Sequence, residues 1–151
     1  MRANPTRVAL MHLEAEDAVR LVDSTEKNLA AVGKWLGELR TQGDLLNRLI
    51  ARGESRRLGR TSAIGIKSVS WDGNRVSARI AGTSGDYDTR ITLFPKAGHH
   101  CTCPDWERNG QKVGPCKHVL RLGEYWRDER LVPAIDTADN ALMGILEHSE
   151  L

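Results

Sequence analysis

Apolar side chains recur with helical spacing through the first third of the chain. Steps of three and four residues between about positions 10 and 52 place them on one face of a helix. The members of this stripe are Val22, Leu29, Val32, Leu36, Leu39, Leu46 and Ile50. Asp23 and Glu26 have the spacing of a capping box, and Gly43 followed by Asp44 is typical of a helix end and a fresh start. The pattern therefore predicts an N-terminal helical hairpin of two or three helices, whose stripe packs within its own domain or against a second copy of the chain.

Beyond a basic, glycine-flanked linker at residues 53–62, the hydrophobic pattern changes from the period of a helix to the two-residue period of a strand. Residues 64–71, 75–80 and 87–94 alternate apolar and polar positions, and Asp72-Gly73-Asn74 between the first two is a hairpin turn signal. These segments predict a three-stranded antiparallel meander with one apolar face. The opposite face is expected to carry Arg75, Arg79 and Arg90.

The last third of the chain returns to helical spacing. Residues 117–130 predict one helix, Pro133 is expected to stop it, and a short C-terminal helix is expected from about 137 to 148. The fold class is thus α+β. We expect an N-terminal helical region (1–60), a central domain (61–133) and a C-terminal helical tail (134–151).

Composition narrows the class of protein. The chain has 151 residues, of which 40% are hydrophobic and 28% are charged, as in ordinary globular domains. No apolar run approaches the ~18 residues of a membrane span, and no secretory signal pattern precedes the first helix. An intracellular protein, cytoplasmic or nuclear, is the expectation.

Charge is distributed unevenly, although the net charge is only +2. Residues 52–96 hold nine basic and four acidic side chains, an excess of five positive charges. This segment either presents a functional basic face or is simply a solvated surface. Further basic residues follow at Arg108, Lys112 and Lys117.

The candidate chemistry lies in a cluster of cysteine and histidine. Cys101 and Cys103 are two residues apart, and Cys116 and His118 repeat that spacing after twelve intervening residues. Three thiolates and one imidazole form the closed tetrahedral set that structural zinc prefers, and sulfur ligands argue against magnesium or calcium. We expect one structural Zn²⁺. Two alternatives remain open, namely that His99 or His100 replaces His118 and that the cysteines are buried thiols.

The same segment resembles the SWIM zinc finger, whose signature is Cys-x-Cys, a variable spacer and Cys-x-His. The match with the family pattern covers about residues 64–126. It includes the strand ITLF before the first cysteine, the Pro-Asp pair after the second cysteine and the CKHVLRL that opens a helix. The family occurs in transposases, in remodelling ATPases and in partners of recombinase paralogues. The resemblance implies binding to DNA or to protein.

An enzyme is not expected. All four coordination positions have candidate protein ligands, whereas a catalytic zinc keeps one open. The sequence also lacks the His-x-Glu and Cys-x-x-Cys of zinc deaminases, a phosphate-binding glycine loop and a nucleophile elbow.

Three functions are therefore weighed. The first is nucleic-acid binding, to DNA more than RNA, through Arg75, Arg79, Arg90, Arg108, Lys112 and Lys117, with Trp106 stacking on a base or covering the zinc. The second is a protein–protein adaptor for an ATPase, recombinase or polymerase complex, docked through its helices. The third is a small structural subunit whose zinc only stabilises the sheet.

Overall fold

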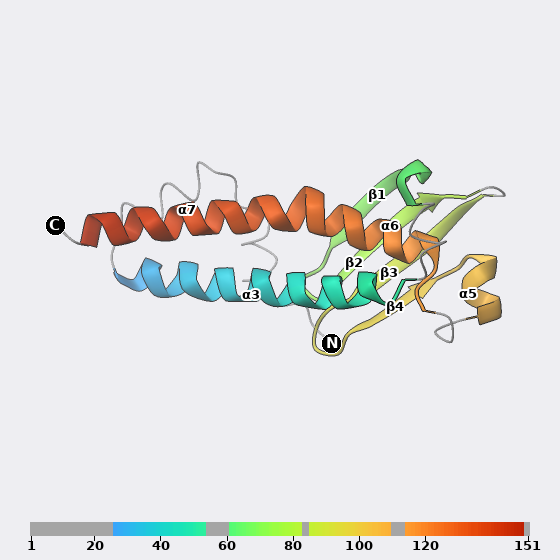
Figure 1. Cartoon of the computed structure of the whole chain (residues 1–151), viewed down its shortest axis with the longest axis horizontal. Helices are drawn as coiled ribbons and strands as arrows, with labels where there is room; N and C mark the ends of the chain where they lie inside the picture. The colour runs from blue at the N-terminus through green and yellow to red at the C-terminus, as the bar shows by residue number, and fades with distance from the viewer. Residues whose placement is uncertain (1–25, 54–60, 83–84, 110–113, 150–151) are drawn as a thin grey trace.

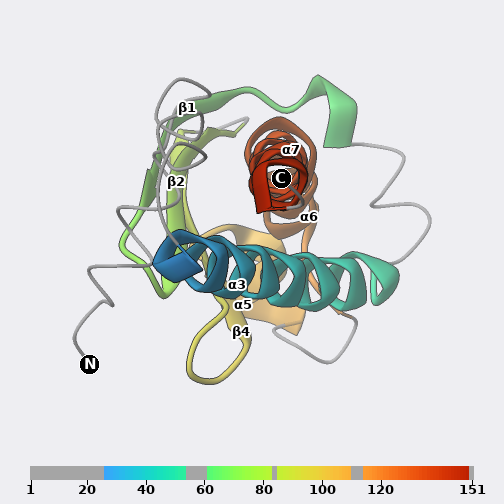
Figure 2. The same cartoon turned by 90° about the vertical axis from the view of Figure 1, so that its left-hand side faces the viewer.

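A computed structural model of the chain describes residues 26–53, 61–82, 85–109 and 114–149. The fold is α+β, as the sequence predicts. A long helix, α3 (Glu26–Ala51), precedes a four-stranded antiparallel sheet, and helices α5 (Pro104–Asn109), α6 (Lys117–Tyr125) and α7 (Val132–Ser149) follow it. Figure 1 shows α3 and α7 extending together to one side of the sheet, and Figure 2 shows that they cross obliquely.

Helix α3 is continuous across Gly43, so the predicted break at Gly43-Asp44 is wrong. A Cβ at position 43 would lie 3.6 Å from Leu131 Cδ2. This glycine therefore lies where α3 contacts the helical segment that ends at Leu131. Tertiary packing here outweighs the weak helix propensity of glycine. The predicted stripe is confirmed from Leu29 onward. The rest of the expected hairpin, including Asp23, lies outside the described residues.

The sheet has the order β1-β2-β3-β4. The first three strands, β1 (Ile66–Trp71), β2 (Arg75–Ala81) and β3 (Asp86–Thr92), are those that the alternation predicts. A fourth, β4 (Gly98–Cys101), pairs with β3 and was not predicted, because its four residues are too few to show a period. It brings the first metal-ligand candidate to the edge of the sheet.

The helix that starts after Cys116 does not stop at Pro133, contrary to the prediction. Helix α6 continues through a π-helical segment, η2 (Trp126–Leu131), directly into α7. A proline in a regular helix clashes with the carbonyl four residues before it. The wider turn of η2 comes just before Pro133 and relaxes that conflict, so the predicted C-terminal helix begins five residues earlier than expected.

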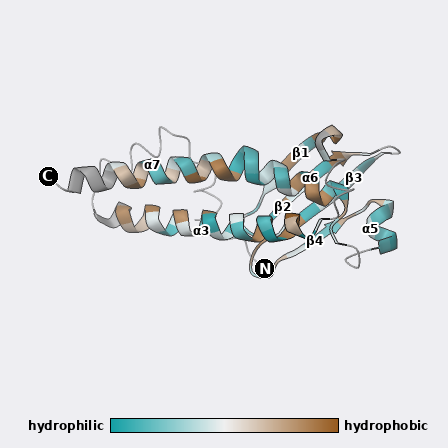
Figure 3. Ribbon diagram, viewed as in Figure 1, coloured by the Kyte–Doolittle hydropathy of each residue, from teal (hydrophilic) through white to brown (hydrophobic). Residues whose placement is uncertain are grey.

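Helix α6 lies between the sheet and α3. A Cβ at Gly123 would meet Ile50 of α3 at 3.5 Å and Ile91 of β3 at 3.6 Å. The core continues into η2, where the ring of Trp126 lies 5.5 Å from that of Trp71 in β1. Figure 3 shows apolar and polar positions alternating along α3, α6 and the strands. Among the described residues, no helix combines the length and the hydrophobicity that a membrane crossing requires.

Candidate metal centre

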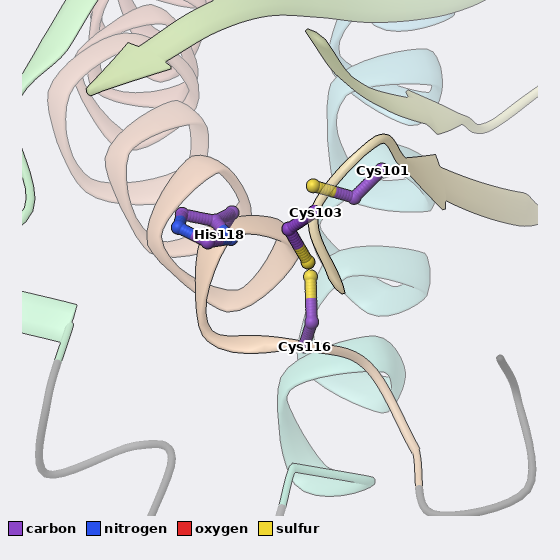
Figure 4. A group of neighbouring side chains, drawn as sticks. All are labelled: Cys101, Cys103, Cys116 and His118. Carbon is purple, nitrogen blue, oxygen red and sulfur yellow. The ribbon is translucent and has the colours of Figure 1, made fainter. Parts of the chain in front are cut away.

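Three elements bring the cysteines and the histidine together. Cys101 is the last residue of β4, and Cys103 directly precedes Pro104, where α5 begins. Cys116 is the N-cap of α6, and His118 lies in the first turn of that helix. The strand end and the helix start thus approach each other, with the side chains directed toward one point (Figure 4).

The donor atoms of these four residues all lie within 4.8 Å of one another, and all four residues are buried. Three sulfurs and one imidazole nitrogen at this spacing suit a tetrahedral zinc ion. The Nδ1 of His118 is also buried without a hydrogen-bond partner among the described residues. The residues therefore fit one structural Zn²⁺, and His99 and His100 are not part of the cluster.

Local hydrogen bonds hold the ligands in place. The backbone N–H of Trp106 donates to Cys103 Sγ over 3.4 Å, and Thr89 Oγ1 lies 3.4 Å from Cys101 Sγ. Without metal, hydrogen bonds with Cys101 and Cys116 lower the pKa of Cys103, whereas hydrogen bonds with Cys101 and Cys103 raise that of Cys116. Burial lowers the pKa of His118, but hydrogen bonds with Cys101 and Cys103 outweigh it and raise this pKa to about 9. The cluster thus shares protons that a metal ion would displace.

The two histidines before Cys101 differ in environment. His100 is exposed, whereas His99 is only 8% exposed and faces inward from β4. The reason is the unpredicted strand, whose alternation turns every second residue toward the core. Trp106 packs beside both rings, with centroid distances of 4.9 Å to His99 and 5.4 Å to His100.

A closed set of buried cysteine and histidine ligands between a sheet edge and a helix defines a zinc-finger type of site. Comparison with models of known protein families supports a site of this type. The family model "SWIM zinc finger" matches residues 92–122, a segment that contains all four ligands. This segment is therefore similar to a SWIM zinc finger, and its four ligands are consistent with one structural Zn²⁺. No curated protein and no solved structure showed a significant match to the chain.

The predicted nucleic-acid contacts fall in two places. Arg75 and Arg79 on β2 and Arg90 on β3 share the outer face of the sheet, opposite the buried residues. Arg108 is exposed on α5, and Lys117 is the first residue of α6, beside the metal ligands. Lys112 lies outside the described residues.

Acidic side chains accompany part of this basic face, although the distribution of charge along the sequence does not place them there. Arg79 pairs with Asp88 directly across the ladder at 3.0 Å, and Arg75 lies 3.7 Å from Asp72. Arg90 has no ion pair among the described residues, and its cross-strand neighbour is His100. The turn at Asp72-Gly73-Asn74 sets only the register of β1 with β2, so the pairing of Arg79 with Asp88 across β2 and β3 could not be predicted from it.

The outer face also carries hydroxyl groups that sequence reasoning missed. A shallow concavity of about 460 Å³ crosses β1, β2 and β3 and is lined in part by Arg79 and Arg90. The hydroxyl side chains that line it are Ser68, Ser70, Ser77 and Thr102. Alternation along each strand could have predicted this, because serines 68, 70 and 77 occupy positions opposite the apolar ones.

Proposed function

We propose that this protein is a DNA-binding accessory module, built on its zinc finger, that acts in recombination, repair, replication, transposition or transcription. One observation supports the proposal above the others, namely the concavity on the outer sheet face that combines Arg79 and Arg90 with several hydroxyl groups. Arginine, serine and threonine side chains are the usual donors to phosphate oxygens. We propose binding rather than catalysis, because all four zinc positions have protein ligands.

The ion pairs on this face are compatible with such a role. The side chains of Arg79 and Asp88 are 56% and 60% exposed, and exposed pairs contribute at most about 1 kcal/mol. A phosphate can therefore replace Asp88 as the partner of Arg79 at little cost. Arg90 needs no such exchange, and we expect it to be the most important single contact.

The test is fluorescence anisotropy of labelled single-stranded and double-stranded DNA with the zinc-loaded protein at several salt concentrations. Arg90→Ala and Arg79→Ala should each weaken binding and reduce the slope of log K against log salt by about 1. The matched control is Arg40→Ala, which removes the same charge from an exposed position on α3. Absence of binding by the loaded protein at low salt, or an equal loss in Arg40→Ala, would refute the proposal.

A protein–protein adaptor is the second candidate, and α7 favours it. Val132 is 44% and Met143 57% exposed, the two large hydrophobic side chains with high exposure among the described residues. They are separated by about three helical turns and therefore share one side of α7. The partner would be an ATPase, recombinase or polymerase complex, or a second copy of the chain. Analytical ultracentrifugation distinguishes a homodimer from a monomer. If the chain forms a homodimer through this side of α7, the double variant Val132→Glu with Met143→Glu should dissociate it. A monomer at every concentration argues against self-association.

A further inference from the structure

A second concavity lies on the other side of the sheet, between the C-terminal half of α3 and the turn that joins β3 to β4. Its volume is about 320 Å³, within the range of small ligand sites. The aliphatic side chains that line it are Leu45, Leu49, Ile91 and Leu93. It shares no lining residue with the concavity on the outer face, and the zinc ligands do not line it.

The charged side chains that line this inner concavity are all basic. Arg48 and Arg52 line it, four positions apart at the end of α3, and none of the residues that line it is acidic. Both arginines are exposed, and neither has an ion pair among the described residues. Two guanidinium groups beside an apolar surface favour a ligand that carries an anion, and carboxylates fit their fork of donors well.

His99 adds an independent sign of a ligand. It lines the inner concavity and is 8% exposed, and neither of its ring nitrogens has a hydrogen-bond partner among the described residues. A buried polar group without a partner costs free energy that a bound ligand can recover. Its edge-on contact with Trp106 fixes the ring but satisfies neither nitrogen.

The aliphatic lining decides what kind of molecule carries the anion. Nucleobases are held mainly by stacking on aromatic rings, and apart from His99 no aromatic side chain lines this concavity. We propose that it binds a peptide segment in which an aliphatic side chain lies beside a carboxylate. The aliphatic group occupies the surface formed by Leu45, Leu49 and Leu93, and Arg48 and Arg52 donate to the carboxylate. This site is distinct from the proposed DNA-binding face, and either can fail without the other.

The experiment is a ¹H–¹⁵N NMR titration of the zinc-loaded protein with N-acetyl-leucine, which carries both groups. Concentrations up to about 10 mM cover the millimolar dissociation constant expected for a ligand of this size. N-acetyl-leucinamide lacks the carboxylate, and N-acetyl-glycine lacks the aliphatic side chain. Saturable shifts are expected at the amides of Ala97, Gly98 and His99, with both analogues at least about tenfold weaker.

Protein variants complete the test. Arg48→Gln with Arg52→Gln should abolish the saturable shifts, whereas Arg40→Gln should leave them unchanged. All three side chains are exposed, so the fold should tolerate these changes, which the dispersion of the spectrum verifies. The proposal is overturned if N-acetyl-leucine gives no saturable shift at these amides, or if the amide analogue binds equally well. It is also overturned if oligothymidylate moves the same signals and competes with N-acetyl-leucine, since the site would then belong to nucleic acid.

Discussion

The indole Nε1 of Trp126 donates a hydrogen bond to Oε1 of Gln42 over 3.4 Å, between two side chains that are almost fully buried. Gln42 lies in the middle of α3, and Trp126 begins the π-helical segment η2. The same indole ring contacts Trp71 of β1 at 5.5 Å. One side chain thus connects the long N-terminal helix, the C-terminal helical rod and the sheet.

Loss of this donor should destabilise the fold. In Trp126→Phe the aromatic core is largely kept, but Gln42 Oε1 becomes a buried acceptor without a partner, which costs about 1–3 kcal/mol. Urea unfolding followed by circular dichroism measures the difference. Met143→Ala, at an exposed position, is the control and should change the free energy of unfolding by less than about 0.5 kcal/mol. An unchanged midpoint in Trp126→Phe would contradict the assigned role.

Removal of zinc should unfold the finger. Binding free energies of about 10–16 kcal/mol in finger-type sites equal or exceed the stability of a typical domain. Chelation, Cys103→Ser and Cys116→Ser are each expected to lower the melting temperature sharply, and β4, α5 and the start of α6 should lose protection from hydrogen exchange. Elemental analysis should find one zinc per wild-type chain. His100→Ala is the matched control and should retain the metal; loss of zinc in this variant would revive the alternative ligand set.

Gly114 should resist substitution. Its φ is +88°, and a Cβ there would lie 2.5 Å from the carbonyl oxygen of Arg52, at the end of α3. Gly114→Ala is therefore expected to cost about 1–3 kcal/mol and to weaken zinc retention, because Cys116 is only two residues away. Gly33→Ala offers a contrast of opposite sign. It lies within α3 with open space around its Cβ, and alanine there should stabilise by about 0.5–1 kcal/mol. Chemical denaturation of both variants measures these changes in the free energy of unfolding.

Asp72 has two separable effects. Its Oδ1 accepts from the backbone N–H groups of Asn74 (2.8 Å) and Arg75 (2.7 Å), and its charge lies close to the Arg75 guanidinium. Asp72→Asn keeps an acceptor for the turn but removes the charge, so it should preserve stability and strengthen DNA binding. Asp72→Ala should instead lower stability by about 1–2 kcal/mol. Anisotropy and thermal melting together separate the two effects. Equal or weaker DNA binding by Asp72→Asn would argue against the outer face as the site.

The sequence was most informative where local chemistry decides the structure. The spacing of Cys101, Cys103, Cys116 and His118 identified the metal ligands, because so few residue types can bind zinc. The hairpin at Asp72-Gly73-Asn74 was equally clear, since Gly73 has a φ of +95° that few other residues adopt. Alternating patterns on both sides of this turn then predicted β1 and β2, although their outer ends lie at Ile66 and Ala81 rather than at 64 and 80.

Prediction failed where a contact with a distant segment outweighs local preference. Gly43 signals a helix end, yet its place beside Leu131 keeps α3 intact. Pro133 signals a stop, yet η2 lets the helix continue. His99 lies in a strand too short to show alternation, so its burial could not be anticipated. The deciding feature is a remote neighbour for Gly43, the adjoining π-helical segment for Pro133 and a strand too brief to have a period for His99.

The helix that holds one zinc ligand in its first turn runs without interruption from Lys117 to Ser149, a length of about 50 Å at roughly 1.5 Å per residue. Occupancy of the metal site therefore determines whether this rod is anchored at its base. Loss of the ion would release the base of this rod while Trp126 still holds its middle to α3 and β1, so the effect of zinc on the shape of the molecule would be confined to the finger end.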